Sequence, residues 1–261
     1  PRLDYSGGAT CPSLLLEPSR TNLIPHSEYI TSVSNSSASY NATESPEGLL
    51  NAPIFTATST DPFLRSDTFS ITTGDTYTIS FYIKGFGTSI GKTCLASATT
   101  LGATTFTLTD SWERISYSEV STSTRTNAQL RIDAPNVGAV VGEQFSVWGM
   151  QIEQASYPTS YIPTYGSAQT RAADLCIDAG DASTFNDNEG VLYIEFSSLT
   201  ENEGVTESKE VSISDGSQNN RVSILLDTRY NRVAFILVNN GVSSNYYYTI
   251  GDAITDKNKF A

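Results

Sequence analysis

Residues 76–83 alternate strictly between large apolar side chains and side chains that carry hydroxyl groups. The first set is Tyr77, Ile79, Phe81 and Ile83, and the second set is Thr76, Thr78, Ser80 and Tyr82. A period of two residues is that of a β-strand with one face against a core. Shorter patterns of this kind recur between turn signals at residues 104–109, 113–120, 128–134 and 144–153. No segment shows helical periodicity, so the sequence predicts an all-β protein built as a β-sandwich.

The composition supports this prediction and excludes some partners. The 261 residues include 35 Ser and 32 Thr, which suit strand surfaces and turns. The formal net charge is −13, and the basic residues are scattered, so no surface suited to a nucleic acid is expected. No apolar run approaches the roughly 20 residues that a membrane-spanning helix needs, so no membrane insertion is expected.

Turn signals and proline content divide the chain into four parts. These are an irregular lead-in packed on the first domain (1–24), a β-sandwich (25–155), a strap and connector rich in Tyr and Pro (156–188), and a second β-sandwich (189–261). Asn239-Asn240-Gly241 predicts a hairpin within the second sandwich. That block ends soon after a strand-like run, so we expect it to be only the N-terminal part of its sandwich.

The sequence offers few groups for catalysis. His26 is the only histidine, and no Ser or Cys stands in the context of a nucleophile elbow. The stretch GFGTSIGKT is similar to a phosphate-binding loop, but only three residues separate Gly87 from the Gly-Lys-Thr, where four are needed. We therefore predict that the chain is not an enzyme and holds no organic cofactor.

The three cysteines, Cys11, Cys94 and Cys176, cannot all pair within one chain, and their spacing fits neither a disulfide framework nor a zinc site. A Cys11–Cys176 bridge and three reduced, buried thiols are both compatible with the sequence. The reduced, buried state is the favoured interpretation.

Two groups of residues are candidate binding sites. Tyr246, Tyr247 and Tyr248 are consecutive in a predicted strand, so their rings alternate between its faces and one or two of them should be exposed to stack on a sugar. The second group is a cluster of oxygen-bearing side chains, Asp178, Asp181, Asp187 and Glu189. Such a cluster fits either an acidic turn or a calcium site.

Two longer stretches carry a family resemblance. PRLDYSGGATCPSLLLEPSRTNL at residues 1–23 resembles the lead-in "PRIDY…CPSLLLEPQRTNL" of many bacteriophage virion proteins. FSVWGMQIEQASYPTSYIPTYGSAQTRAAD at residues 145–174 resembles the segment "VWGAQLEEGSYATSYIPT…TRAAD" that closes a jelly-roll module in the same proteins. The module is similar to the jelly-roll carbohydrate-binding modules of polysaccharide-degrading enzymes. EGVLYIEFSSL, from residue 189, resembles the opening of a concanavalin-A-like, laminin-G-type sandwich.

The resemblance implies a jelly roll followed by part of a concanavalin-A-like sandwich, in a non-enzymatic tail fibre, head fibre or decoration protein. Such a protein is assembled in the host cytoplasm and lies on the virion surface. Its expected partners are other virion proteins, further copies of itself (three in a fibre) and a host-surface glycan. Two alternatives remain: a secreted bacterial pair of polysaccharide-binding modules attached to a glycoside hydrolase, and the non-catalytic part of a depolymerase tailspike.

The shared motifs are parts of the scaffold, and no carbohydrate site carries over from the family. We expect five of their residues to anchor the lead-in, the closing strand and the strap to one another: Glu17, Arg20, Trp148, Arg171 and Asp174.

Overall fold

The computed structural model describes residues 2–4, 10, 12–30, 32–177, 179–181, 183, 190–198, 208–227, 230–250 and 258–260. The chain forms two compact units, a first unit (Arg2–Asp174) and a second unit (Leu175–Ala261). Among the described residues, no helix has the length and hydrophobicity that crossing a membrane requires.

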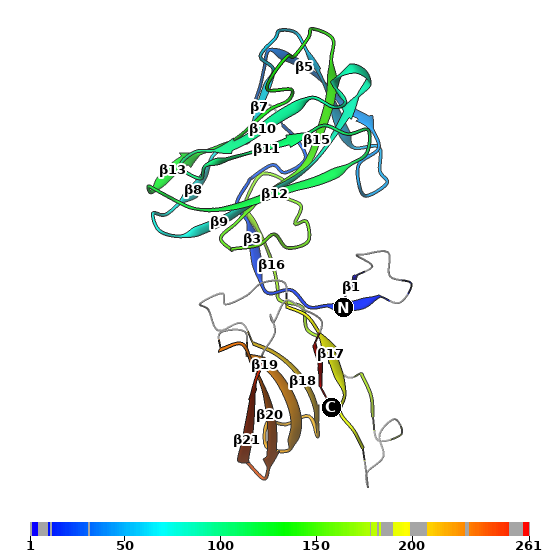
Figure 1. Ribbon diagram of the computed structural model, residues 1–261, viewed down its shortest axis with the longest axis vertical. Helices are drawn as coiled ribbons and strands as arrows, with labels where there is room; N and C mark the ends of the chain where they lie inside the picture. Colours follow the sequence, from blue (N-terminus) through cyan, green and yellow to red (C-terminus); the bar gives the residue numbers. More distant parts are fainter. Residues whose placement is uncertain are drawn as a thin grey trace. The chain divides into compact units, whose positions relative to one another are not determined.

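The first unit contains two five-stranded antiparallel sheets (Figure 1). The sheet that we call the covered sheet has the order β12 (Glu113–Val120), β9 (Thr76–Phe86), β15 (Gln144–Glu153), β6 (Ala52–Ala57) and β5 (Ser36–Thr43). The other, which we call the open sheet, has the order β11 (Ala103–Thr107), β10 (Thr93–Ala98), β14 (Leu130–Asp133), β7 (Phe63–Arg65) and β4 (Ser32–Ser34).

Shorter elements complete the first unit. Three two-stranded pairs are β1 (Arg2–Asp4) with β2 (Ser13–Leu15), β3 (Arg20–Asn22) with β16 (Gln169–Arg171), and β8 (Phe69–Ile71) with β13 (Arg125–Ala128). A 3₁₀ helix, η2 (Gly87–Ser89), follows β9. The pair β3–β16 joins the lead-in to the chain that follows the closing strand, so these two distant segments lie side by side.

The hydrophobic core lies between the two sheets. Its members include Phe55, Phe81 and Phe145 from the covered sheet and Leu64, Leu130 and Ile132 from the open sheet, all at most 1% exposed. The ring of Phe81 contacts that of Phe106 in β11 edge-on, with 5.7 Å between the ring centroids. The predicted all-β jelly-roll sandwich is therefore confirmed.

Strand β9 has the predicted core face, but its opposite face is buried as well. The four apolar residues of the alternation, Tyr77, Ile79, Phe81 and Ile83, are at most 3% exposed. Thr78 and Ser80 on the other face are also buried. The hydroxyl of Thr78 donates to the carbonyl of Ala155 at 2.8 Å, because the segment after β15 runs over this face. The strap therefore covers the outer side of the covered sheet.

A β-bulge interrupts the pairing of β15 with β9. Trp148 lies opposite Tyr82 and Gln151 lies opposite Ser80, so the register shifts between these two pairs. Gly149 has a φ of +64°, and a Cβ there would lie 3.3 Å from the rings of Tyr82 and Tyr161. Glycine is the residue that tolerates both conditions.

The described cysteines differ in their environments. Cys94 in β10 is buried and free, and burial raises the pKa of its thiol to about 12. Cys176 is free and exposed, so the expectation of a buried thiol is wrong for this residue: it lies in a segment without regular structure beyond β16. Cys11 lies outside the described residues.

The second unit contains a four-stranded antiparallel sheet with the order β18 (Ser208–Ser214), β19 (Arg221–Asp227), β20 (Arg232–Asn239) and β21 (Val242–Thr249). A further pair joins β17 (Ile194–Phe196) to β22 (Asn258–Phe260). Asn240 and Gly241 both have positive φ and connect β20 to β21, which confirms the predicted hairpin. The small core of this unit contains Ile224, Leu226, Val233 and Ile250.

Candidate functional site

The outer face of the open sheet carries rows of polar side chains across its strands. The strand registers align Ser97, Arg131, Arg65 and Ser32 in one row, and Thr105, Leu95, Asp133, Phe63 and Ser34 in the next. Neighbouring residues such as Ala96, Ile132 and Leu64 point into the core, so the side chains of these rows point outward. Apart from Asp133 they are exposed or half-buried. This face is therefore accessible, whereas the strap covers the centre of the outer face of the covered sheet and leaves the edge strands β12 and β5 exposed.

Arg131 and Asp133 form the best-ordered polar group of this face. The Nε of Arg131 donates to both carboxylate oxygens of Asp133 at 3.0 Å. The Asp133 side chain is only 5% exposed, while that of Arg131 is 35% exposed. The hydrogen bond to Asp133 raises the pKa of Arg131. The buried carboxylate thus fixes the half-exposed guanidinium of Arg131, which can present its remaining N–H donors to a ligand on the sheet.

Phe63 places an aromatic ring beside this pair. The guanidinium carbon of Arg131 lies 4.0 Å from the centroid of the Phe63 ring, and that of Arg65 lies 4.6 Å from it. Arg65 is directly opposite Arg131 in the register of β7 and β14. We call Phe63, Arg65, Arg131 and Asp133 the arginine cluster.

The arginine cluster is suited to binding a polyhydroxylated ligand. Guanidinium and carboxylate groups bind hydroxyl groups through hydrogen bonds that contribute about 1.5–3 kcal/mol each. The hydroxyls of Ser97, Ser32 and Thr105 add weaker donors and acceptors in the same rows. These rows cross the strands of the open sheet, so these features fit a polysaccharide.

The sequence pattern predicts a strand at 128–134 but does not mark the members of the arginine cluster. The available signal was the placing of charged residues at alternate positions, as in Arg131 and Asp133. Arg131 and Asp133 lie beside Phe63 and Arg65 because β14 pairs with β7. The residue periodicity within a strand does not predict which strands pair.

Three of the expected anchor residues meet where the lead-in contacts the strap. An Nη of Arg171 lies 3.3 Å from a carboxylate oxygen of Glu17. The other oxygen of Glu17 accepts a hydrogen bond from the Ser160 backbone at 2.7 Å. The Glu17 backbone N–H donates to the carboxylate of Asp174 at 2.9 Å, and the Asp174 N–H donates to the Glu17 carbonyl at 2.8 Å.

The other two anchors contact tyrosines of the strap. The Arg20 guanidinium lies 5.4 Å from the centroid of the Tyr157 ring. Trp148 is 1% exposed and packs against Tyr161, with 4.6 Å between ring centroids, and against Tyr82. All five anchors thus lie among buried or inter-segment contacts of the scaffold, away from the open sheet.

The predicted tyrosine site lies on β21, an edge strand of the second unit. Tyr246, Tyr247 and Tyr248 are 68%, 56% and 59% exposed, rather than one or two of the three, because no described segment packs over either face of this edge. Tyr246 and Tyr248 share a face with Phe235 and Val233. Tyr247 is on the other face, where the Arg232 guanidinium lies 4.2 Å from its ring centroid. The three rings therefore do not form one platform.

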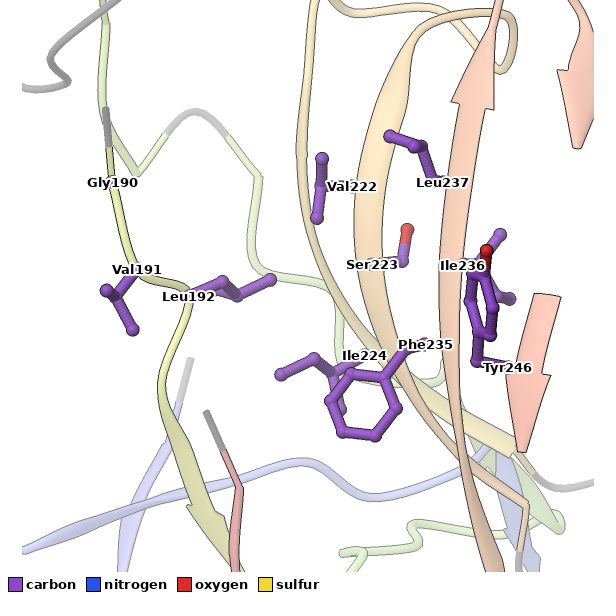
Figure 2. Close-up of a pocket in the computed structure, with 10 residues that line it drawn as sticks. All are labelled: Gly190, Val191, Leu192, Val222, Ser223, Ile224, Phe235, Ile236, Leu237 and Tyr246. Atoms are coloured by element: carbon purple, nitrogen blue, oxygen red, sulfur yellow. The ribbon is translucent and has the colours of Figure 1, made fainter. Parts of the chain in front are cut away.

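An open hollow of about 350 Å³ lies beside these tyrosines (Figure 2). Figure 2 shows Leu192 and Ile224 pointing into the space between residues 190–192 and the sheet, with Phe235 beside them. Apart from Ser223 and Tyr246, the lining side chains are aliphatic or phenyl groups. The hollow has few polar groups to orient a sugar and continues the small core of the second unit.

Of the predicted calcium ligands, Asp178, Asp187 and Glu189 lie outside the described residues. Asp181 is exposed, and its carboxylate accepts hydrogen bonds from the backbone and hydroxyl of Ser183. No group of His, Cys, Asp or Glu side chains suited to a metal ion occurs in the part of the chain that the structure describes. The calcium site stays a prediction.

No protein-family model and no curated protein sequence matches this chain. Similar solved structures include the C-terminal CBM6 of LamC, a marine laminarinase from Zobellia galactanivorans, at 12% identity over 51% of this chain and 98% of that one, with a TM-score of 0.34. Another is the carbohydrate-binding module CBM6cm-2 from Cellvibrio mixtus lichenase 5A in complex with cellotriose, at 16% identity over 51% and 94%, with a TM-score of 0.33.

A third similar structure is the enzymatically active domain of tailspike protein 4 from bacteriophage CBA120, at 12% identity over 48% of this chain and 20% of that one, with a TM-score of 0.35. At these TM-scores the matches add nothing to the fold, which the two sheets of the first unit define by themselves.

Proposed function

We propose that the first unit binds a carbohydrate on the outer face of the open sheet, without catalysing a reaction. The observation that carries this proposal is the arginine cluster, set among hydroxyl side chains on the accessible outer face of the open sheet. The carboxylate of Asp133 is held by Arg131 and is nearly buried, so it is not placed as a free general base.

A site of this kind is expected to be weak when it acts alone. An accessible sheet face buries little of a ligand. The measured affinity reflects only the part of the interaction free energy that exceeds the cost of ordering the ligand and the side chains. Several copies on one particle would raise the overall affinity without any new contact. We therefore propose that the protein acts as an oligomer, three copies in a fibre, on the surface of a tailed-phage virion where it contributes to host attachment.

The virion role is supported by the two segments that resemble phage virion proteins. In the folded chain these segments pair with each other through β3 and β16 and meet at Glu17 and Arg171. The lead-in motif and the closing motif therefore belong to one structural unit.

Mass spectrometry of purified virions tests the virion role. Peptides of this chain are expected at a copy number comparable with that of other fibre or decoration proteins. Virions that lack the chain, from a lysate in which it is expressed, would contradict the proposal.

The binding face is tested with the double variant Arg131→Met, Asp133→Leu. Replacing both partners together avoids leaving one buried charge unpaired, which would destabilise the fold. Loss of two or more charged hydrogen bonds is expected to lower the affinity for a bound polysaccharide by about 10- to 100-fold. The measurement is affinity electrophoresis or calorimetry with the protein displayed on a multivalent carrier.

The matched control is Arg125→Met, which removes an exposed arginine in β13, outside both five-stranded sheets. It is expected to change the affinity by less than about twofold, because it makes no contact on the open face. Equal affinities of the double variant, the control and the unmodified chain, with unchanged melting curves, would rule out this face as the binding site.

A further inference from the structure

The open face carries two arginines, Arg65 and Arg131, and two carboxylates, Asp61 and Asp133, lie beside the second of them. The chain has a formal net charge of −13, yet two arginines lie directly opposite each other on adjacent strands of this face. Like charges at opposite positions of a sheet destabilise it. The pair Arg65 and Arg131 therefore needs either internal neutralisation or a ligand of negative charge.

Internal neutralisation accounts for only one of the two arginines. Arg131 is paired with the nearly buried carboxylate of Asp133 and lies 3.9 Å from that of Asp61, whose side chain is 67% exposed. Arg65 has no carboxylate within ion-pair distance among the described residues; the contact that holds it is the ring of Phe63 at 4.6 Å. The half-buried Arg65 thus has no carboxylate within ion-pair distance among the described residues, although Asp61 and Asp133 equal the two arginines in number.

The contact with Phe63 also holds the Arg65 guanidinium in a position in which it can bind an anion. A guanidinium that stacks on an aromatic ring keeps its N–H donors at its edge, where they can form two parallel hydrogen bonds to a carboxylate or a phosphate. Ser32, which is exposed and opposite Arg65 in the register, can supply a further hydroxyl donor.

We infer that the ligand of the open face is an anionic polysaccharide, whose carboxylate or phosphate groups are bound by Arg65 while Arg131, held in place by Asp133, binds its hydroxyl groups. This inference rests on the carbohydrate-binding function proposed above, and it assigns the two parts of the arginine cluster to different parts of the ligand. Arg65 determines the preference for charge, and the Arg131–Asp133 pair determines binding to the sugar.

The test uses the 261-residue chain on a multivalent carrier with three probes. These are polygalacturonate, the same polymer after reduction of its carboxyl groups to alcohols, and poly(ribitol phosphate). The reduced polymer keeps the sugar backbone and removes the charge, so the ratio of the two affinities measures the contribution of the carboxylate. The third probe distinguishes phosphate from carboxylate as the recognised group.

The unmodified protein is expected to bind at least one anionic probe about tenfold or more tightly than the reduced polymer, with an affinity that falls as salt rises from 50 to 300 mM. Arg65→Gln should abolish this preference, because it should lower the affinity for the anionic probe far more than the affinity for the reduced polymer. Arg125→Gln, which removes an exposed charge outside both five-stranded sheets, should leave the preference intact. Arg65→Lys keeps the charge without the planar fork and should retain part of the preference.

Equal affinities for the charged and reduced polymers, or equal effects of Arg65→Gln and Arg125→Gln, would overturn the inference about charge. The proposed function would survive that outcome if the double variant of Arg131 and Asp133 still lost affinity for the reduced polymer. Failure of the unmodified protein to bind any of the three probes would overturn both.

Discussion

Phe81→Asp is expected to prevent the first unit from folding. Phe81 is fully buried in β9, and its ring packs edge-on against Phe106 of the facing sheet. An aspartate there loses the aromatic packing, which by itself costs about 3–5 kcal/mol. It also places an unpaired carboxylate in an apolar core, which adds several kcal/mol. The sum is comparable with the whole stability of an ordinary domain, about 5–15 kcal/mol.

The measurement is far-UV and near-UV circular dichroism with thermal and urea unfolding of the purified variant. Ser70→Asp is the matched control, because Ser70 is exposed in β8 between two buried residues, and it should melt within a few degrees of the unmodified chain. A soluble Phe81→Asp protein with a cooperative transition would show that this core is not what holds the first unit together.

Glu17→Gln is expected to release the lead-in and the strap from the sandwich. Glu17 is 4% exposed, and its carboxylate lies between the Arg171 guanidinium and the Ser160 backbone. The substitution keeps the size of the side chain but removes the carboxylate charge beside Arg171, whose side chain is 19% exposed and keeps its hydrogen bonds to the carbonyls of Ser160 and Pro18. Breaking such a pair costs about 3 kcal/mol. The corresponding fall in melting temperature is roughly 10 °C for a unit of this size.

Limited proteolysis gives the second measurement for this variant. Cleavage within residues 12–24 and 155–174 should become faster than in the unmodified chain, while Glu113→Gln, at an exposed carboxylate in β12, should have no effect. A double-mutant cycle with Arg171→Met should give a coupling free energy of about 1–3 kcal/mol. Rapid cleavage of both segments in the unmodified protein, with the sandwich left intact, would show that they are free linkers.

The contact between strap and sheet also bears on the binding site. Arg114 donates hydrogen bonds to the Ser80 hydroxyl at 2.9 Å and to the Thr159 carbonyl at 2.7 Å, so it joins the covered sheet to the strap. Because the strap occupies the centre of this outer face, the uncovered outer face of the open sheet is the one available to a long ligand in the first unit. Loosening the strap with Glu17→Gln should therefore lower the thermal stability of the first unit more than it lowers the affinity for a polysaccharide.

The sequence by itself determined the fold class, the core face of β9 and the hairpin at Asn240-Gly241. These features depend on residues close together in the chain: alternation within one strand decides which side chains share a face, and two residues with positive φ decide a tight turn. The anchors Glu17 and Arg171 also stood out in the sequence, as parts of motifs, although not as an ion pair.

The tertiary structure decided which polar residues are buried and which are brought together. Thr78 and Ser80 belong to the polar face of β9, yet both are buried. Thr78 donates to the carbonyl of Ala155, and the Ser80 hydroxyl accepts from Arg114, which also donates to the carbonyl of Thr159 in the strap. Phe63 and Arg65 meet Arg131 and Asp133 only because β7 pairs with β14. Strand order is a property of the whole chain, since lateral neighbours come from distant segments, and the pattern within a single strand carries no information about it.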